Sequence, residues 1–150
     1  MKKIIILFIY LYSGLYALER ESTLKMYHGI FSALTSKAMI SIYTTDEEYI
    51  KVFTASKRII LAQKPEESDI MLITDRSTLN NILESDTIDQ DTKRPILFVT
   101  DYHFLKYSED VVGAFYWRKG RSQLLFIHKR LEEHNITLPV LYQKFMIDEL

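Results

Sequence analysis

Short apolar runs alternate with polar, helix-compatible segments through the middle of this chain, and this alternation limits its possible folds more than any other feature. Residues 38–44, 58–62, 69–74 and 96–100 are rich in β-branched and other apolar side chains, with the length and composition of buried strands. The run at 96–100 is almost wholly apolar, which is typical of a strand covered on both faces. We therefore predict a largely parallel sheet with 96–100 at its centre.

Helices are predicted before and between these strands. Apolar residues recur at three-to-four spacing over 21–34, which places them on one helical face. Thr45 and Asp46 with the acids that follow predict a helix to about residue 56, and a further helix is expected over 77–84. The polar stretch 85–94 is the longest predicted loop. Strands that alternate with helices in this way favour a layered α/β domain.

The last third of the chain has a different pattern. Residues 111–117 and 123–128 read as two strands, and the short connection around Gly120 predicts an antiparallel hairpin. A short helix over 129–134 and a terminal helix after Pro139 should follow. The predicted fold is thus α/β, a three-layer sandwich with a mixed, mostly parallel sheet and a C-terminal hairpin plus helix.

Residues 1–17 have the composition of a secretory signal peptide. Lys2 and Lys3 precede the apolar run 4–11, and Leu15-Tyr16-Ala17 offers a small-residue cleavage site. The apolar stretch is shorter than the roughly twenty residues that span a bilayer, so an uncleaved anchor is the less favoured alternative. We expect a single domain over 18–150, exported to the periplasm.

Composition excludes several classes of function. The chain has 19 basic and 20 acidic residues and no cysteine. Loss of Lys2 and Lys3 with the signal peptide would make the net charge about −3, which does not suit binding to a phosphate backbone. The lack of cysteine excludes disulfides, thiol catalysis and cysteine-ligated metals.

Three side chains at predicted strand ends form a candidate ligand site. Asp75 follows the strand 69–74, and Asp101 and His103 follow the strand 96–100. Ligands of open α/β sheets bind beyond the carboxyl ends of the strands, where an acid and a histidine could serve acid–base chemistry or hold a metal. The alternative, which we favour, is that the aspartates end strands and satisfy nearby backbone groups.

Enzyme signatures are missing from the sequence. It has no HExxH, no GxSxG and no glycine-rich phosphate loop, and after residue 17 its only glycines are Gly29, Gly113 and Gly120. We therefore predict a non-enzymatic protein without a cofactor or a bound metal.

The predicted hairpin is the candidate partner-binding surface. Phe115 and Trp117 share one face of their strand, and Arg118 and Arg121 flank the turn. Aromatic and arginine side chains are the commonest interface anchors. The alternative is that the face carrying Phe115 and Trp117 belongs to the core, as most aromatic rings do in such a chain.

Asn135 is a candidate modification site. Glu133-His134-Asn135-Ile136-Thr137 fits the acceptor pattern of bacterial N-linked glycosylation, an acid two residues before Asn-x-Thr. The alternative is that Asn135 ends the preceding helix in a left-handed conformation. Both can hold at once, because a helix-ending asparagine is usually exposed.

The order of these elements resembles the YfiR/HmsC-like periplasmic proteins. The resemblance covers most of residues 18–150 and is sharpest near the C-terminus, although His128 stands where that family usually has Asn. The matching segments are the helix 24–34, DIMLIT, PILFVTD, VVGAFYWRKGRSQLLFI and the ending LEEHNITLP, with Gly113, Ile127, Leu131, Ile136 and Leu138 at the corresponding places.

The resemblance implies a small regulator that binds the periplasmic part of an inner-membrane signalling protein, often a diguanylate cyclase, and restrains its output. A homodimer is compatible with this expectation. Disulfide control, found in some members, cannot apply to a chain without cysteine. The second hypothesis is a small-ligand-binding periplasmic protein that uses the crevice near Asp75, Asp101 and His103, and a periplasmic hydrolase is the third.

Overall fold

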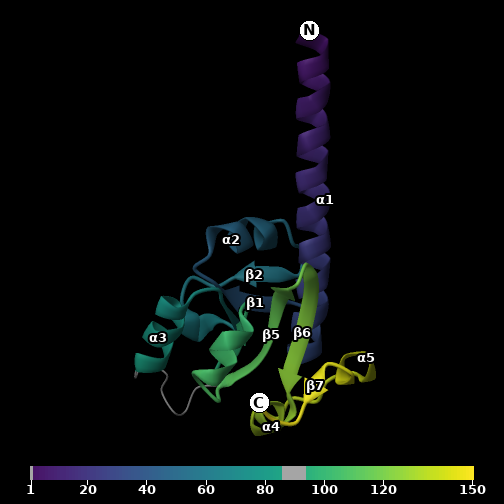
Figure 1. Ribbon diagram of the computed structural model, residues 1–150. Helices are drawn as coiled ribbons and strands as arrows, with labels where there is room; N and C mark the ends of the chain where they lie inside the picture. The colour runs from purple at the N-terminus through teal and green to yellow at the C-terminus, as the bar shows by residue number, and fades with distance from the viewer. Residues whose placement is uncertain (1, 86–93) are drawn as a thin grey trace.

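The sheet of this protein has seven strands in the order β2-β1-β3-β4-β5-β6-β7 (Figure 1). The structure is a computed structural model that describes residues 2–85 and 94–150, with side chains from Glu19 onward. The elements are α1 Lys2–Thr35, β1 Ile40–Tyr43, α2 Glu47–Thr54, β2 Ile59–Leu61, the 3-10 helix η1 Pro65–Glu67, β3 Ile70–Ile73, α3 Arg76–Glu84, β4 Ile96–Val99, the 3-10 helix η2 Tyr102–Lys106, β5 Val111–Arg118, β6 Arg121–Ile127, α4 His128–Glu133, α5 Val140–Gln143 and β7 Met146–Ile147.

Parallel pairing joins the first five strands of the sheet. The pairs β2–β1, β1–β3, β3–β4 and β4–β5 are parallel, β5–β6 is antiparallel, and β6–β7 is parallel again. β4 lies in the middle of the order, and all of its residues are buried. The prediction of a mixed, mostly parallel sheet with this strand at its centre is confirmed.

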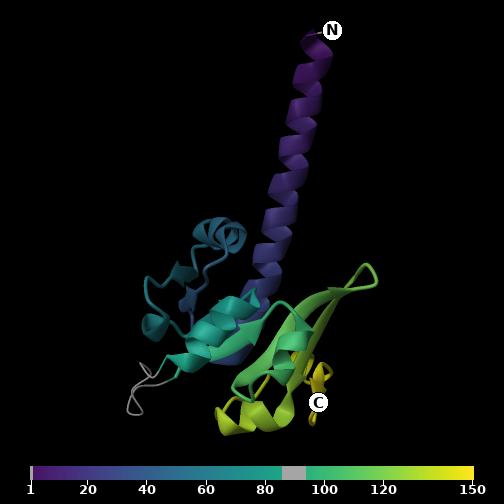
Figure 2. The same cartoon turned by 60° about the vertical axis from the view of Figure 1, so that its left-hand side comes forward.

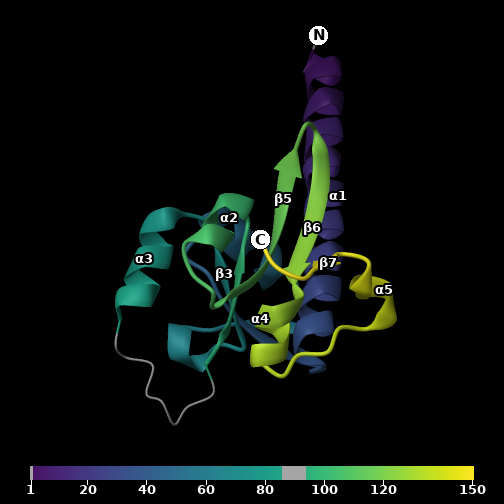
Figure 3. The ribbon, with the colours of Figure 1, turned by 60° about the horizontal axis from the view of Figure 1, so that its bottom comes forward.

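Helices cover both faces of the sheet, which makes three layers (Figures 1 and 3). On one face, buried residues of α1 and α2 pack against Ile42, Leu72 and Phe98. On the other face, α3 and η2 pack against Met71 and Val99. Side chains of successive strand residues alternate between the two core clusters, as the pleat of a strand requires.

The centre of the α1 layer is a cluster of aromatic rings around Tyr27. The Tyr27 ring lies 5.4 Å from Phe31, 5.3 Å from Tyr49 and 5.8 Å from Phe53, measured between ring centroids. Its hydroxyl donates to the Tyr49 hydroxyl at 3.1 Å, which satisfies a buried polar group. Burial raises the pKa of the Tyr27 phenol far above its ordinary value, so this ring stays neutral.

Gly113 allows β5 to pack tightly between its neighbours. The register of β4 and β5 shifts by one residue, since Leu97 pairs with Val111 and Phe98 with Gly113. A Cβ at Gly113 would lie 2.6 Å from the Leu125 carbonyl oxygen and 2.9 Å from the Phe126 ring. Only glycine fits this bulge without displacing the next strand.

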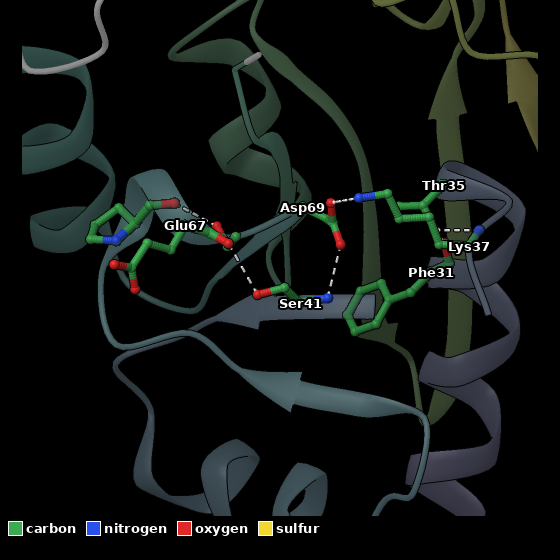
Figure 4. Close-up of polar contacts among 8 residues, drawn as sticks. Phe31, Thr35, Lys37, Ser41, Glu67 and Asp69 are labelled. Atoms are coloured by element: carbon green, nitrogen blue, oxygen red, sulfur yellow. Dashed lines mark hydrogen bonds and ion pairs between the residues drawn. The ribbon is translucent and has the colours of Figure 1, made fainter. Parts of the chain in front are cut away.

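A polar network fixes the connection from α1 into β1 (Figure 4). The Asp69 carboxylate accepts from the Ser41 backbone N–H at 2.9 Å and forms an ion pair with Lys37. The Ser41 hydroxyl donates to the Glu67 carbonyl oxygen at 3.2 Å. These contacts tie the start of β3 to the start of β1, and so position the parallel part of the sheet under α1.

The C-terminal region differs from the prediction in detail. The short helix and the helix after Pro139 are present, but α5 has only four residues, and Pro139 is its N-cap rather than its first residue. The chain then adds β7 to the sheet, a strand that the sequence pattern did not indicate. Most of the predicted loop 85–94 lies outside the described residues.

α1 is one continuous helix that includes residues 2–17 of the predicted signal segment (Figure 1). None of the helices in the described part of the chain is both long enough and apolar enough to span a membrane.

Candidate functional site

The tip of the β5–β6 hairpin projects away from the rest of the sheet (Figure 2). Lys119 and Gly120 form its two-residue turn with φ of 52° and 73°, and Arg118 pairs with Arg121 across it. Two successive left-handed residues are the signature of a type I′ turn, in which glycine is strongly favoured. The predicted tight turn is confirmed.

The four predicted partner-binding residues have different environments. Trp117 is 71% exposed, and Arg118 and Arg121 are exposed at the tip. Phe115, however, is buried, with its ring centroid 5.6 Å from that of Tyr27. For Phe115 the alternative interpretation as a core residue is therefore confirmed and its assignment to the surface is wrong, whereas Trp117, on the same face, lies beyond the core.

The opposite face of the hairpin packs on η2. The Tyr116 ring lies 5.0 Å from the Tyr102 ring, and the Arg118 guanidinium lies 5.9 Å from the centroid of the same ring. This aromatic and cationic stack supports the projecting strands from one side, so the free side of the hairpin is the one that carries Trp117.

A groove of about 590 Å³ lies beside the hairpin, and we call it the hairpin groove. Its walls are one flank of α1, the β5–β6 strands and the C-terminal segment around α5, which Figure 3 shows next to α1 and β6. Its lining is mostly apolar, with two lysines at the edge. The lining residues are Ser22, Lys25, Met26, Ile30, Phe115, Ser122, Leu124, Leu141, Tyr142, Lys144 and Phe145.

The edge of β6 is open along this groove. β7 pairs with β6 only at Phe126 and Ile127. In the described part of the chain, residues 121–125 of β6 pair with β5 alone. Their outward N–H and C=O groups are the kind of backbone edge that accepts an added strand.

Gly29 makes the close approach of α1 to this segment possible. A Cβ at Gly29 would lie 2.6 Å from the Tyr142 hydroxyl. The Tyr142 ring also contacts Phe126, with centroids 6.5 Å apart. Sequence reasoning missed Leu141, Tyr142 and Phe145 as groove residues, since only the return of the chain beside α1 brings them there.

The predicted ligand residues Asp75 and Asp101 each cap a helix. Asp75 accepts from the Thr78 backbone N–H at 2.8 Å and from its hydroxyl at 2.7 Å. These hydrogen bonds hold the pKa of the Asp75 carboxyl below its ordinary value. Asp101 accepts from the His103 backbone N–H at 2.9 Å and lies 2.7 Å from its ring Nδ1. Both aspartates therefore have the capping role that the alternative interpretation gave them.

A pocket does exist near the carboxyl ends of β1 and β3, but it is built from other residues. It has a volume of about 330 Å³, and Tyr43, Met71, Thr78 and Ile82 are among its lining residues. Asp75, Asp101 and His103 do not line it. Within residues 2–85 and 94–150, no group of three or more His, Asp or Glu side chains could hold a metal ion. Ligand binding by the predicted three residues stays a prediction.

Arg130 on α4 holds the segment between η2 and β5. Its Nη1 donates to the carbonyl oxygens of Leu105 at 2.9 Å, Ser108 at 3.0 Å and Val111 at 2.8 Å. Partial burial lowers the pKa of this guanidinium, although nearby acids oppose the shift. The sequence showed no sign of this function, because all three acceptors are backbone atoms distant along the chain.

Asn135 has the left-handed conformation that ends α4. Its φ is 55°, and the Ile136 N–H donates to the Leu131 carbonyl oxygen at 2.9 Å while the Asn135 N–H donates to that of Glu132 at 2.9 Å. This pair of bonds is the Schellman motif. Asn135 is exposed, so the structural interpretation is confirmed while glycosylation stays a prediction.

Two sequence comparisons found no match for this chain. No family model matches it, and no curated protein matches it. The similarity to YfiR/HmsC-like proteins therefore stays a prediction from the sequence pattern.

Proposed function

We propose that this protein is an exported, non-enzymatic regulator that binds the periplasmic part of an inner-membrane signalling protein, such as a diguanylate cyclase, and restrains its output. The observation that carries the proposal is the open edge of β6 beside the hairpin groove. The signal peptide predicted at residues 1–17 supports the compartment, and the sequence resemblance supports the class of partner.

An extended segment of the partner fits this site by strand addition. The free N–H and C=O groups of β6 would supply main-chain hydrogen bonds, and alternate side chains of the added strand would enter the groove. The lining side chains that it would meet include Met26, Leu124 and Phe145. Affinity would then come from the backbone, and selectivity from the fit of the side chains.

Two exposed apolar side chains lie on the elements that form this site. Trp117 is 71% exposed on the hairpin, and Leu141 is 68% exposed on α5. Large apolar side chains that gather around a groove mark interaction surfaces, and tryptophan is among the commonest anchors. The groove-lining residues that the structure describes include neither a histidine nor a carboxylate, a composition that suits binding rather than acid–base chemistry.

Photo-crosslinking with a matched pair of variants tests this proposal. A photoreactive amino acid at position 117 should crosslink a membrane protein that has a periplasmic domain and a cyclase or kinase output domain. In a separate pull-down without the photoreactive residue, Trp117→Ala combined with Leu141→Ala should weaken capture of that protein by about tenfold or more, because exposed anchors carry most of the affinity of an interface. The control variant, Ile60→Ala with Leu83→Ala, removes two other exposed apolar side chains, on β2 and α3, and should capture normally.

Deletion of the gene provides the functional measurement. If the partner is a diguanylate cyclase that this protein restrains, cellular cyclic di-GMP should rise on deletion, and the Trp117→Ala/Leu141→Ala variant should fail to lower it. Equal complementation by this variant and by the control would contradict the proposed site. Crosslinking only to soluble periplasmic proteins would contradict the proposed class of partner.

A further inference from the structure

A second groove lies on the other flank of α1, between α1 and α2, and we call it the basic groove. It has a volume of about 730 Å³, and the two helices that form its walls are adjacent in Figure 1. Its lining residues are Arg20, Glu21, Leu24, Lys25, His28, Lys51, Val52, Ala55, Ser56, Lys57 and Arg58.

The basic groove concentrates positive charge on a chain whose net charge is −1. Among the described residues that line it, five side chains are cations and Glu21 is the one carboxylate. Lys51 pairs with Glu48 at 3.0 Å. In the part of the chain that the structure describes, none of the salt bridges involves Arg20, Lys25, Lys57 or Arg58. The potential in the groove is therefore positive, which favours an anionic occupant.

The positions of the apolar and basic residues in the groove indicate which class of anionic ligand fits it. Its floor is formed by apolar side chains of both helices, Leu24 and Val52. Cations stand on both sides of this floor, Arg20 and Lys25 on α1, and Lys57 and Arg58 after α2. Because these cations come from two separate elements that border an apolar floor, a small anion would leave that floor uncovered, and a flat membrane surface would leave the concave groove unfilled. A helix with an apolar ridge flanked by carboxylates matches both the floor and the walls.

We propose that the basic groove binds an acidic amphipathic helix of a protein partner. The proposal rests on the proposed function for the existence of such a partner, and it adds the chemistry of a second contact. The carboxylates of the helix pair with the cations of α1 and of the α2–β2 connection, and its apolar ridge covers Leu24 and Val52. Helix-in-groove binding of this kind differs from the strand addition at β6.

Fluorescence anisotropy tests this inference with the exported protein. The probe is a short fluorescein-labelled helical peptide with a leucine ridge flanked by glutamates, and the control probe has glutamine in place of each glutamate. The acidic peptide should bind, and the glutamine peptide should not. Raising the salt concentration to about 1 M, where the Debye length falls to about 3 Å, should weaken binding severely.

Charge-reversal variants locate the binding site. Lys57→Glu with Arg58→Glu should weaken binding of the acidic peptide by at least about tenfold, since two exposed attractive pairs become repulsive. Lys64→Glu with Lys106→Glu makes the same change in net charge at exposed positions outside the groove, and it should bind like the wild type. If the first variant unfolds, Lys57→Gln with Arg58→Gln gives a weaker effect in the same direction, and circular dichroism confirms that each variant is folded.

Several results would overturn the inference. These are an acidic peptide that does not bind, equal affinity in the groove variant and the control variant, and displacement of the peptide by inorganic phosphate beyond the effect of chloride at the same ionic strength. Vesicles of phosphatidylglycerol that bind in a Lys57- and Arg58-dependent way, while the peptide does not, would assign the groove to lipid instead. Lys57 and Arg58, the positions changed in the peptide assay, do not line the hairpin groove. The crosslinking experiment at position 117 can therefore fail while this one succeeds, and the reverse holds too.

Discussion

Replacement of Arg130 should loosen the segment that joins η2 to β5. Arg130→Met keeps the aliphatic part of the side chain and removes the guanidinium, so it tests the hydrogen bonds rather than the packing. The variant would lose the hydrogen bonds from Nη1 to the carbonyl oxygens of Leu105, Ser108 and Val111, which lie 2.8–3.0 Å from that nitrogen.

The expected loss of stability follows from the geometry of this nitrogen. Nη1 carries two hydrogens for three acceptors, so about two full hydrogen bonds are at stake. A hydrogen bond to a charged group contributes about 1.5–3 kcal/mol, and the segment is partly open to water, which replaces some of the loss. We expect the free energy of unfolding to fall by about 3 kcal/mol, which lowers the melting temperature of a domain of this size by about 9 °C.

Urea and thermal unfolding followed by circular dichroism measure this change. The adjacent Lys129→Met variant is the control, because Lys129 is exposed and should shift the midpoint little. Arg130→Lys should recover only part of the loss, since an ammonium cannot reproduce the planar geometry of the guanidinium. A melting temperature of Arg130→Met close to that of Lys129→Met would refute the reasoning.

Three further predictions concern single positions. Gly29→Ala alone should leave the free energy of unfolding nearly unchanged, because a gain of about 1 kcal/mol in helix propensity is offset by a clash with the Tyr142 hydroxyl. In a Tyr142→Phe background the same change should stabilise the protein, and additive effects on the free energy of unfolding in a double-mutant cycle would contradict this contact. The wild-type protein should be more stable than Asp75→Asn at neutral pH, and this difference should shrink as the pH falls through the lowered pKa of the Asp75 carboxyl, because protonation weakens its hydrogen bonds with Thr78. A difference in stability that does not change with pH in urea titrations would contradict this prediction. Mass spectrometry of a peptide containing Asn135, from a host that glycosylates exported proteins, should show added glycan mass, and an unmodified peptide would end that hypothesis.

The sequence pattern predicted the layers and the sheet because these depend on local periodicity. The apolar run at 96–100 indicated a strand buried on both faces, and β4 is one. Gly120 indicated the tight turn, and its φ of 73° explains why. Two-residue strands such as β7 are too short to leave a periodic signal, so the last strand was missed.

The candidate site could be predicted only in part. Alternation along β5 showed that Phe115 and Trp117 share a face, but it could not show that the core ends between them. That boundary depends on Tyr27, which contacts Phe115 from α1. The hairpin groove needs Tyr142 to return beside Gly29, and such contacts between distant segments have no signature in a single sequence.

Lys25 lines both the hairpin groove and the basic groove. An occupant that neutralises this ammonium from one side therefore changes the electrostatic potential felt by an occupant on the other side. Thermodynamic linkage makes the effect mutual: whatever factor the first ligand applies to the affinity of the second, the second applies to the first. One lysine on a helix that both grooves share is enough to couple two binding events energetically, without any movement of the backbone.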